Sequence, residues 1–179
     1  MRTGGSPRAG QRTVRRGGGG RAVRRGVVAD PYAVPMSETP STAAARKMRV
    51  RAGSRAHFVD APPATLAGMA LPELRVEQEL DGEFDYLHLF ATTQDAMAHT
   101  FPVLRDHLRH DGMLWVSWPK GGKLGTDLNM KSVIRIGYGF GLVESVCLRV
   151  DELWAGLKFT RPKPGKTYRN SYGTLPDAR

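Results

Sequence analysis

The chain has 179 residues, which suits one domain with extensions, because domains cluster at roughly 100–150 residues. Hydrophobic residues make up 40% of it, which excludes disorder throughout. The formal net charge of +10 lies at the two ends: residues 1–35 sum to +7, residues 161–179 to +4 and residues 36–160 to −1. The nearly neutral body excludes a nucleic-acid-binding face on the fold, and the lack of a long apolar run excludes a transmembrane helix.

The two ends of the chain also differ from its body in composition. Residues 1–35 hold eight Arg and eight of the 21 Gly residues without apolar periodicity, which predicts a disordered extension. An alternative is that translation begins at Met36. Residues 162–179 are rich in Pro, Lys and Gly and predict a disordered basic tail, which leaves residues 41–161 as the folded domain. Cys147 is the one cysteine, which excludes an internal disulfide and indicates a reducing, cytoplasmic location.

The first half of the domain shows alternating helix and strand patterns. A run of alanines predicts a helix over residues 43–48, and residues 55–60 have the pattern of a strand that ends at two prolines. Pro63 suits the first turn of a following helix, and the alternation in residues 75–80 predicts a half-buried strand. The apolar segment Phe84–Phe90 predicts a buried central strand.

The alternation continues in the second half. The spacing of Thr92 and Asp95 is typical of a capped helix start, and we expect Pro102 to kink or divide this helix. Residues 111–112, Asp-Gly, predict its end. Residues 113–118 are the most apolar stretch of the chain and predict the next strand.

A last helix and a hairpin close the domain. Thr126 or Asp127 is the predicted cap of this helix, and glycines from Gly137 onward predict its end. Residues 142–150 and 153–160 are predicted strands whose link is so short that they must be antiparallel. The element order predicts an α/β fold: a three-layer Rossmann-like sandwich with a mostly parallel six-stranded sheet of strand order 2-1-3-4-6-5 and a C-terminal antiparallel hairpin.

Several segments resemble known families. Phe84–Phe90 resembles the central acidic-then-apolar strand of class I methyltransferases, and residues 108–116 resemble the turn and strand that follow it there. Residues 115–120, 126–128 and 154–159 more closely resemble the domain of unknown function 3052 family, a bacterial family without assigned activity. The resemblance covers most of the domain and implies a Rossmann-like fold whose last strand is antiparallel.

The turn after the first predicted strand departs from the methyltransferase pattern. A methyltransferase has glycines there, which let backbone N–H groups approach the cofactor closely. This chain has Asp60-Ala61-Pro62-Pro63, in which the prolines lack N–H groups and stiffen the turn. S-adenosylmethionine binding in the usual mode is therefore not expected, and no cofactor is predicted.

Open α/β sheets bind ligands outside the carboxyl ends of their strands, where the strand order reverses. In the predicted order this point lies between the first and third strands. Lys120 and Lys123 flank two glycines before a helix, so they either bind a phosphate or carboxylate or are simply solvated. The ligand-binding candidates at this edge are Asp60, Thr92, Thr93, Ser117, Trp118, Lys120, Lys123 and Asp127.

Some of these residues have a chemical and a structural interpretation. Asp60 and Lys120 are either an acid–base pair or a surface ion pair. Ser117 and Lys120 have the residue types of a Ser–Lys nucleophile, but Ser117 lies inside a predicted strand. His88 is expected to be a hydrogen-bonded core histidine and Cys147 a small buried side chain. The spacing of the histidines predicts no metal site.

The C-terminal hairpin supplies the secondary candidates Asp151, Trp154 and Lys158. Trp154 and Lys158 are four residues apart on a predicted strand and therefore share a face. A lysine on a sheet face needs a partner, which Asp151 or Glu144 would supply. We expect Trp115 in the core, and Trp118 either in the core or lining a pocket.

These observations favour a non-catalytic binding or regulatory module that has lost the methyltransferase cofactor loop. One alternative is an enzyme or sensor that holds a phosphorylated or carboxylated small molecule at residues 120–127. Another is an atypical S-adenosylmethionine-dependent methyltransferase. The expected partner is a protein or a small anionic ligand; binding of nucleic acid through the folded body and binding to a membrane are not expected. The sequence leaves both enzymatic activity and oligomeric state open.

Overall fold

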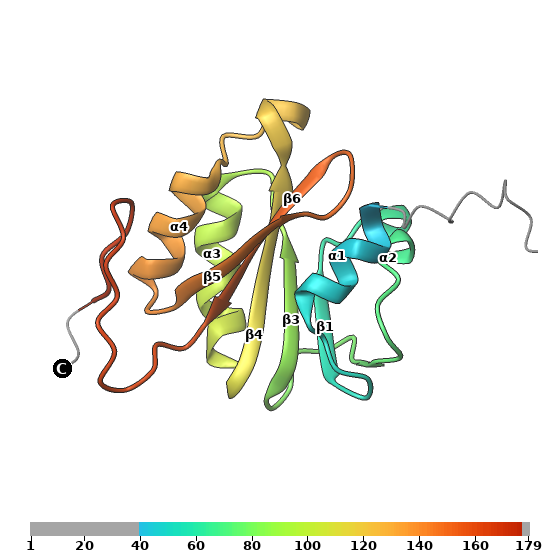
Figure 1. Cartoon of the computed structure of the whole chain (residues 1–179), viewed down its shortest axis with the longest axis horizontal. Coiled ribbons are helices and arrows are strands. Elements are labelled where there is room, and N and C mark those ends of the chain that lie inside the picture. Colours follow the sequence, from blue (N-terminus) through green and yellow to red (C-terminus); the bar gives the residue numbers. More distant parts are fainter. Residues whose placement is uncertain (1–39, 177–179) are drawn as a thin grey trace, which may run out of the picture. The chain divides into compact units, whose positions relative to one another are not determined.

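The structure is a computed structural model that describes residues 40–176. The predictions for residues 1–35, a disordered extension or a start at Met36, lie outside the described residues. The described part forms one mixed sheet with helices on both faces (Figure 1). None of its helices is long and apolar enough to cross a membrane.

Six strands form the sheet: β1 (Arg55–Val59), β2 (Arg75–Val76), β3 (Phe84–Phe90), β4 (Leu108–Pro119), β5 (Val143–Arg149) and β6 (Trp154–Thr160). Their order is β2-β1-β3-β4-β6-β5, which confirms the prediction. The pairs of β1 with β2, β1 with β3 and β3 with β4 are parallel, whereas β6 is antiparallel to both β4 and β5. The C-terminal hairpin therefore joins the sheet beside β4.

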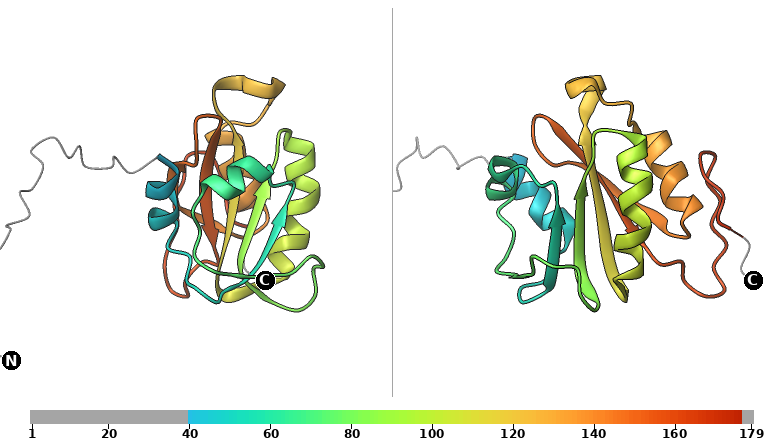
Figure 2. Two further views of the ribbon diagram at one scale, coloured as in Figure 1. Left: turned by 90° about the vertical axis from the view of Figure 1, so that its right-hand side faces the viewer. Right: turned by 180° about the vertical axis from the view of Figure 1, so that it is seen from behind.

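The helices make the sheet the middle of three layers. α1 (Pro40–Met48) and α2 (Pro63–Gly68) lie on one face, and α3 (Gln94–Asp106) and α4 (Met130–Gly139) on the other (Figure 2). Each face has its own core, with Trp115 and Tyr86 buried beneath α1 and α2, and Phe101 and Phe159 buried beneath α3 and α4. Burial on both faces explains why β3 is apolar almost throughout.

α3 differs from its prediction at both of its ends. Thr93, and not Thr92, caps it, because the Thr93 Oγ1 accepts the N–H of Ala96 at 3.1 Å. Pro102 does not divide the helix, because burial of the apolar side of α3 outweighs the local cost of a proline; a kink at Pro102 stays a prediction. The helix ends at Asp106, earlier than predicted.

β4 accordingly begins earlier than predicted, at Leu108, and its pairing with β3 is irregular between Phe84 and Tyr86. Gly112 lies at this irregularity. A Cβ atom at Gly112 would come within 2.9 Å of the Phe84 carbonyl oxygen. The Asp-Gly pair that predicts a helix end therefore serves a close approach of two strands instead.

α4 begins later than predicted, because Asn129 caps it. The Asn129 Oδ1 accepts the N–H groups of Lys131 and Ser132 at 3.0 and 3.1 Å, and the Ser132 Oγ accepts the Asn129 N–H at 3.0 Å. This reciprocal arrangement satisfies the first donors of the helix. The prediction of Thr126 or Asp127 as the cap is wrong, because the helix begins beyond both.

Replacing Asn129 by Ala should lower the free energy of unfolding by about 1 kcal/mol, because two helix N–H groups lose their acceptor. Urea unfolding followed by circular dichroism measures this change. Arg135→Ala truncates an exposed side chain of the same helix and is the matched control, with an expected change within about 0.5 kcal/mol. Equal effects of the two variants would contradict the capping role.

Two predictions at the edges of the sheet are wrong. β2 covers only Arg75–Val76 of the predicted residues 75–80. Cys147 is exposed and not buried. It lies in β5, the outermost strand, whose alternate side chains reach solvent because β5 has a neighbour on one side only.

Residues 162–176 form no helix or strand, yet they pack on the domain. Tyr168 and Leu175 contact the core on the side of α4, and the Asn170 Nδ2 donates to the Glu144 Oε1 at 2.6 Å. A disordered basic tail over residues 162–179 stays a prediction from composition, and residues 177–179 lie outside the described residues. The few apolar side chains of residues 162–176 pack on an apolar surface of the domain, which composition alone does not reveal.

Candidate functional site

Lys120 and Lys123, the predicted anion-binding residues at the carboxyl ends of the parallel strands, donate hydrogen bonds within the fold. These residues belong to the turn segment Lys120–Gly125, which follows β4 and in which residues 121–124 depart from helical backbone geometry. The Lys120 Nζ donates to the Asp151 carbonyl at 2.8 Å, and the Lys123 Nζ donates to the Glu152 carbonyl at 3.3 Å. Both amines therefore hold the turn between β5 and β6.

The helix starts beside this edge already have side-chain caps. Thr93 and Asp127 accept N–H groups of α3, with the Asp127 Oδ1 at 2.8 Å from the Gln94 nitrogen. Asn129 caps α4 in the same way. An anion at either helix start would have to displace a cap, so the geometry does not favour residues 120–127 as an anion site.

Asp60 and Lys120 do not form the acid–base pair considered from the sequence. Asp60 is exposed, in a left-handed backbone conformation with φ of 52°, whereas Lys120 bonds to the Asp151 carbonyl. Among the described residues, no side chain hydrogen-bonds to the half-buried Thr92 side chain. The structure thus does not bring these candidates together into a reactive group.

Asp151 organises the turn between β5 and β6. Its Oδ1 accepts the N–H groups of Leu153 and Trp154, each at 2.7 Å, and its Oδ2 accepts the Thr65 hydroxyl at 2.8 Å. Trp154 and Trp118 are each only 5% exposed, so Trp118 belongs to the core and does not line an open pocket. These three candidates therefore have structural roles.

A buried chain of polar side chains crosses the middle of the sheet, and the sequence reveals only part of it. The His88 Nε2 lies 2.8 Å from the Ser117 Oγ, and the His88 Nδ1 lies 2.7 Å from the Tyr86 hydroxyl. This confirms His88 as a hydrogen-bonded core histidine. The alternation of β3 puts Tyr86 and His88 on one face, but their bond to Ser117 depends on the register with β4.

This chain is structural, although a Ser beside a His resembles a nucleophile and its base. All three side chains have 0% exposure, so a substrate has no access to them. Burial lowers the pKa of His88 to about 3 and raises the pKa of Tyr86 well above its ordinary value. The imidazole is therefore neutral at physiological pH. It provides hydrogen-bond partners for the buried hydroxyl groups of Tyr86 and Ser117.

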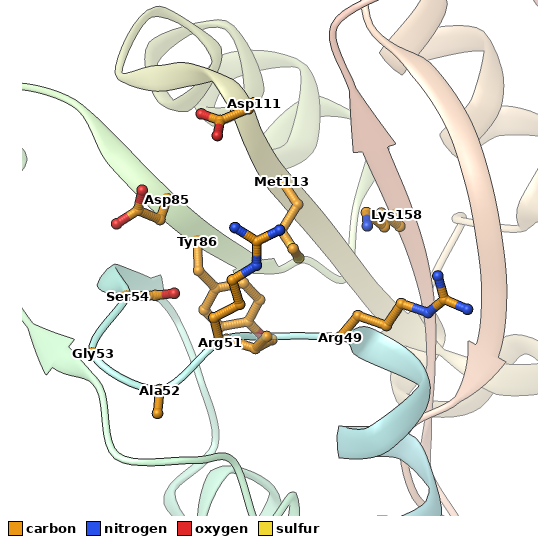
Figure 3. A pocket seen from close by; sticks show the side chains of 11 residues that line it. Arg49, Arg51, Ala52, Gly53, Ser54, Asp85, Tyr86, Asp111, Met113 and Lys158 are labelled. Carbon is orange, nitrogen blue, oxygen red and sulfur yellow. The ribbon is translucent and has the colours of Figure 1, made fainter.

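An open cleft of about 620 Å³ lies at the opposite end of the sheet, beside the amino ends of β1, β3 and β4 (Figure 3). The connection from α1 to β1, residues 49–54, forms one wall, and β3, β4 and β6 form the other. Val50 and Met113 give it a small apolar floor that is continuous with the core beneath α1. The size of the cleft lies within the range of small-molecule sites.

The cleft is lined by three cationic side chains, Arg49, Arg51 and Lys158 (Figure 3). None of the three has a hydrogen-bond or ion-pair partner among the side chains that the structure describes. Arg49 directly follows α1 with φ of 56°, a backbone region that non-glycine residues seldom adopt. Such positions concentrate at functional sites.

Two carboxylates also line the cleft, but both interact with groups other than its three cations. The Asp85 Oδ2 accepts the Arg55 N–H at 2.9 Å, and the Asp85 Oδ1 accepts the Arg109 Nη1 at 3.0 Å. Asp111 lies 3.7 Å from the Arg109 Nε. The cleft therefore has an excess of positive charge. Among the described residues, no three His, Cys, Asp or Glu side chains are grouped to hold a metal ion.

Lys158 is half-buried on β6, opposite Trp115 of β4. Burial lowers the pKa of its amine, and the positive charge of Arg49 lowers that pKa further. The prediction that Asp151 or Glu144 would pair with it is wrong, because both carboxylates are engaged elsewhere. The secondary candidate Lys158 is thus the one predicted site residue that lines the cleft.

Arg49 and Arg51 are not among the predicted site residues, although the sequence carries a signal for them. Residues 46–51 contain four cations, and no acid lies between Glu38 and Asp60. This charge becomes meaningful only when the segment is placed beside Lys158, more than a hundred positions later in the chain.

The turn after β1 does not fit S-adenosylmethionine in the usual methyltransferase mode. Asp60 has left-handed backbone geometry, and Pro62 and Pro63 offer no N–H group to a ligand. α2, which follows this turn, has only six residues. This turn therefore lacks the glycines that let the backbone of a methyltransferase approach its cofactor closely.

No family model and no curated protein matches the chain, so membership of the domain of unknown function 3052 family is not confirmed. Solved structures of methyltransferases are similar to it at low identity. The ribosomal protein L11 methylase from Lactobacillus delbrueckii subsp. bulgaricus has 12% identity and a TM-score of 0.45, covering 69% of this chain and 77% of that one. A methyltransferase from Pyrococcus furiosus has 15% identity and a TM-score of 0.45, covering 63% and 77%. A TehB-like SAM-dependent methyltransferase from Corynebacterium glutamicum has 11% identity and a TM-score of 0.45, covering 70% and 89%.

Proposed function

We propose that this chain is a binding or regulatory module whose ligand is a small anion, held in the cleft between residues 49–54 and strands β3, β4 and β6. Arg49, Arg51 and Lys158 would face the anionic group. The floor of Val50 and Met113 would contact an apolar part of the same molecule. The proposal moves the site away from residues 120–127, whose lysines and helix starts are already bonded.

The observation that carries this proposal is the amine of Lys158. A half-buried cation without a carboxylate is unfavourable, because it has lost part of its hydration without a compensating charge. Arg49 adds like-charge repulsion, as the lowered pKa of Lys158 reflects. A bound anion would supply the missing negative charge beside Arg49 and Lys158.

A thermal-shift screen followed by calorimetry on the full chain tests the proposal. The panel holds inorganic phosphate, pyruvate, citrate, nucleotides and S-adenosylhomocysteine at constant ionic strength. A specific ligand at about a hundred times its Kd stabilises the fold by roughly 2.7 kcal/mol, which raises Tm by several degrees. Lys158→Met should weaken that ligand by about 10–100-fold, because a charge-assisted hydrogen bond is lost.

Two lysine variants serve as matched controls for the cleft. Lys131→Met removes an exposed cation from α4 on the other face of the sheet and should leave binding unchanged. Lys123→Met tests the loop of residues 120–127. Binding that survives Lys158→Met but is lost in Lys123→Met would place the anion in that loop and contradict the cleft.

An atypical methyltransferase is a second candidate, because the antiparallel C-terminal hairpin of the sheet is a feature that the chain shares with class I methyltransferases. Its turn at Pro62 and Pro63 argues against it. The S-adenosylhomocysteine arm of the screen distinguishes the two, since stabilisation by that compound alone would favour methyl transfer. No stabilisation by any compound would leave a protein-interaction module as the better account.

A further inference from the structure

We propose that the Lys158 amine condenses reversibly with the carbonyl carbon of a small 2-oxo carboxylate, so that the cleft binds such a ligand covalently. This inference rests on the proposed function, because Arg49 and Arg51 would hold the carboxylate beside the amine. It adds a chemical step that anion binding alone does not require.

Lys158 differs from the other lysines of residues 40–176 in its surroundings. Lys120 and Lys123 donate to backbone carbonyls, and the amines of Lys131 and Lys166 lie over tyrosine rings. Lys47 and Lys163 are exposed. Lys158 alone lines the 620 Å³ cleft, half-buried and without a hydrogen-bond acceptor among the described side chains. Its place in the middle of β6 fixes the backbone from which the amine projects (Figure 3).

The protonation of this amine favours nucleophilic attack. Only the neutral amine has a free electron pair, and a neighbouring cation together with burial increases the neutral fraction of a lysine. Burial and the charge of Arg49 both act in this direction on Lys158. The same Arg49 would attract the carboxylate of the ligand, so one residue favours both the reactive amine and its substrate.

The step balances without an oxidant or a metal ion. The amine nitrogen attacks the carbonyl carbon and forms a C–N bond. The carbonyl oxygen then leaves as water with the two protons of the neutral amine, which yields an imine. Water in the open cleft carries the protons between nitrogen and oxygen, and it returns the free amine by the reverse reaction.

The neighbouring positions of Arg49 and Lys158 in the cleft would suit a ligand whose carbonyl is next to its carboxylate. Arg49 and Lys158 lie close enough for the guanidinium charge to act on the amine. A 2-oxo acid presents a carboxylate and an electrophilic carbon on adjacent atoms, so that one ligand reaches both groups. Its remaining carbons would lie on Val50 and Met113.

The test is reductive trapping of the full chain with pyruvate and sodium cyanoborohydride, followed by intact mass measurement and peptide mapping. We expect the reduced adduct to form faster on Lys158 than on any other lysine of residues 40–176, because the cleft holds the carboxylate of pyruvate beside this amine. Acetone, which has the carbonyl but no carboxylate, should react much more slowly. Lys131→Met should leave the adduct on Lys158 unchanged.

Lys158→Arg separates this inference from the proposed function, because it keeps the positive charge and removes the nucleophile. We expect it to retain the pyruvate-dependent thermal shift and to lose the adduct. Adducts spread evenly over the lysines, or an undiminished adduct in Lys158→Arg, would overturn imine formation while a retained shift still supported anion binding. Absence of both shift and adduct in the unchanged chain would overturn both proposals.

Discussion

Acidification should destabilise this protein through His88 by about 4 kcal/mol between pH 7 and pH 3. In the unfolded chain this imidazole gains a proton near pH 6.5, the ordinary pKa of a histidine, whereas burial lowers the pKa in the folded state to about 3. Between these two values the unfolded state binds the additional proton. The free energy of unfolding therefore falls as the pH falls, by up to about 1.4 kcal/mol per pH unit.

Urea unfolding at a series of pH values from 7 to 4.5 measures this effect, in the unchanged chain and in His88→Gln. The variant loses stability at neutral pH because Tyr86 and Ser117 lose their partner, so the relevant quantity is the pH dependence. Over this range His88→Gln should remove about 2–3 kcal/mol of the acid-induced loss. His99→Gln removes an exposed imidazole and is the matched control. Parallel pH profiles of the unchanged chain and His88→Gln would contradict a neutral buried His88.

The fold could be predicted because its determinants are local and repeated. The apolar segment Phe84–Phe90, the alternation of strands and helices and the short link before β6 together restrict the topology. The errors fall where a residue serves a distant contact. Gly112 indicates a helix end locally but permits the close approach of β3 and β4, and Cys147 lies on an edge strand whose exposure depends on the whole sheet.

The candidate site was harder to predict, because its residues come together only in the folded chain. Because ligands commonly bind at the carboxyl ends of strands, the sequence favours Lys120 and Lys123 as site residues. In the structure these two lysines instead hydrogen-bond to the β5–β6 turn. The cleft lies at the other end of the sheet and joins the connection after α1 to β6. Sequence alone gives the face of Lys158, but neither its proximity to Arg49 nor the lack of a carboxylate beside it.

Replacing Gly137 by Ala should lower the free energy of unfolding by about 3 kcal/mol, the upper end of the range for overpacking. Gly137 lies inside α4, where the sequence predicts the helix to end. A Cβ atom there would meet three carbons of the Phe159 ring at 2.1, 2.6 and 2.8 Å. The ring is fully buried and packs edge-to-face on Phe101 at 5.3 Å, so it has no space into which to move.

Gly139→Ala is the matched control in the same helix, because a Cβ atom at Gly139 would meet nothing within 4 Å. Its expected effect has the opposite sign, a gain of up to about 1 kcal/mol from helix propensity. Chemical denaturation of both variants measures the two changes, and Phe159→Leu in the Gly137→Ala background should recover part of the loss by making room for the methyl group. If both alanines stabilised the protein alike, helix propensity alone would govern this stretch of α4. The opposite signs that we expect would instead mean that the contact between α4 and β6 requires glycine at position 137, which is why a residue that ends helices elsewhere lies inside this one.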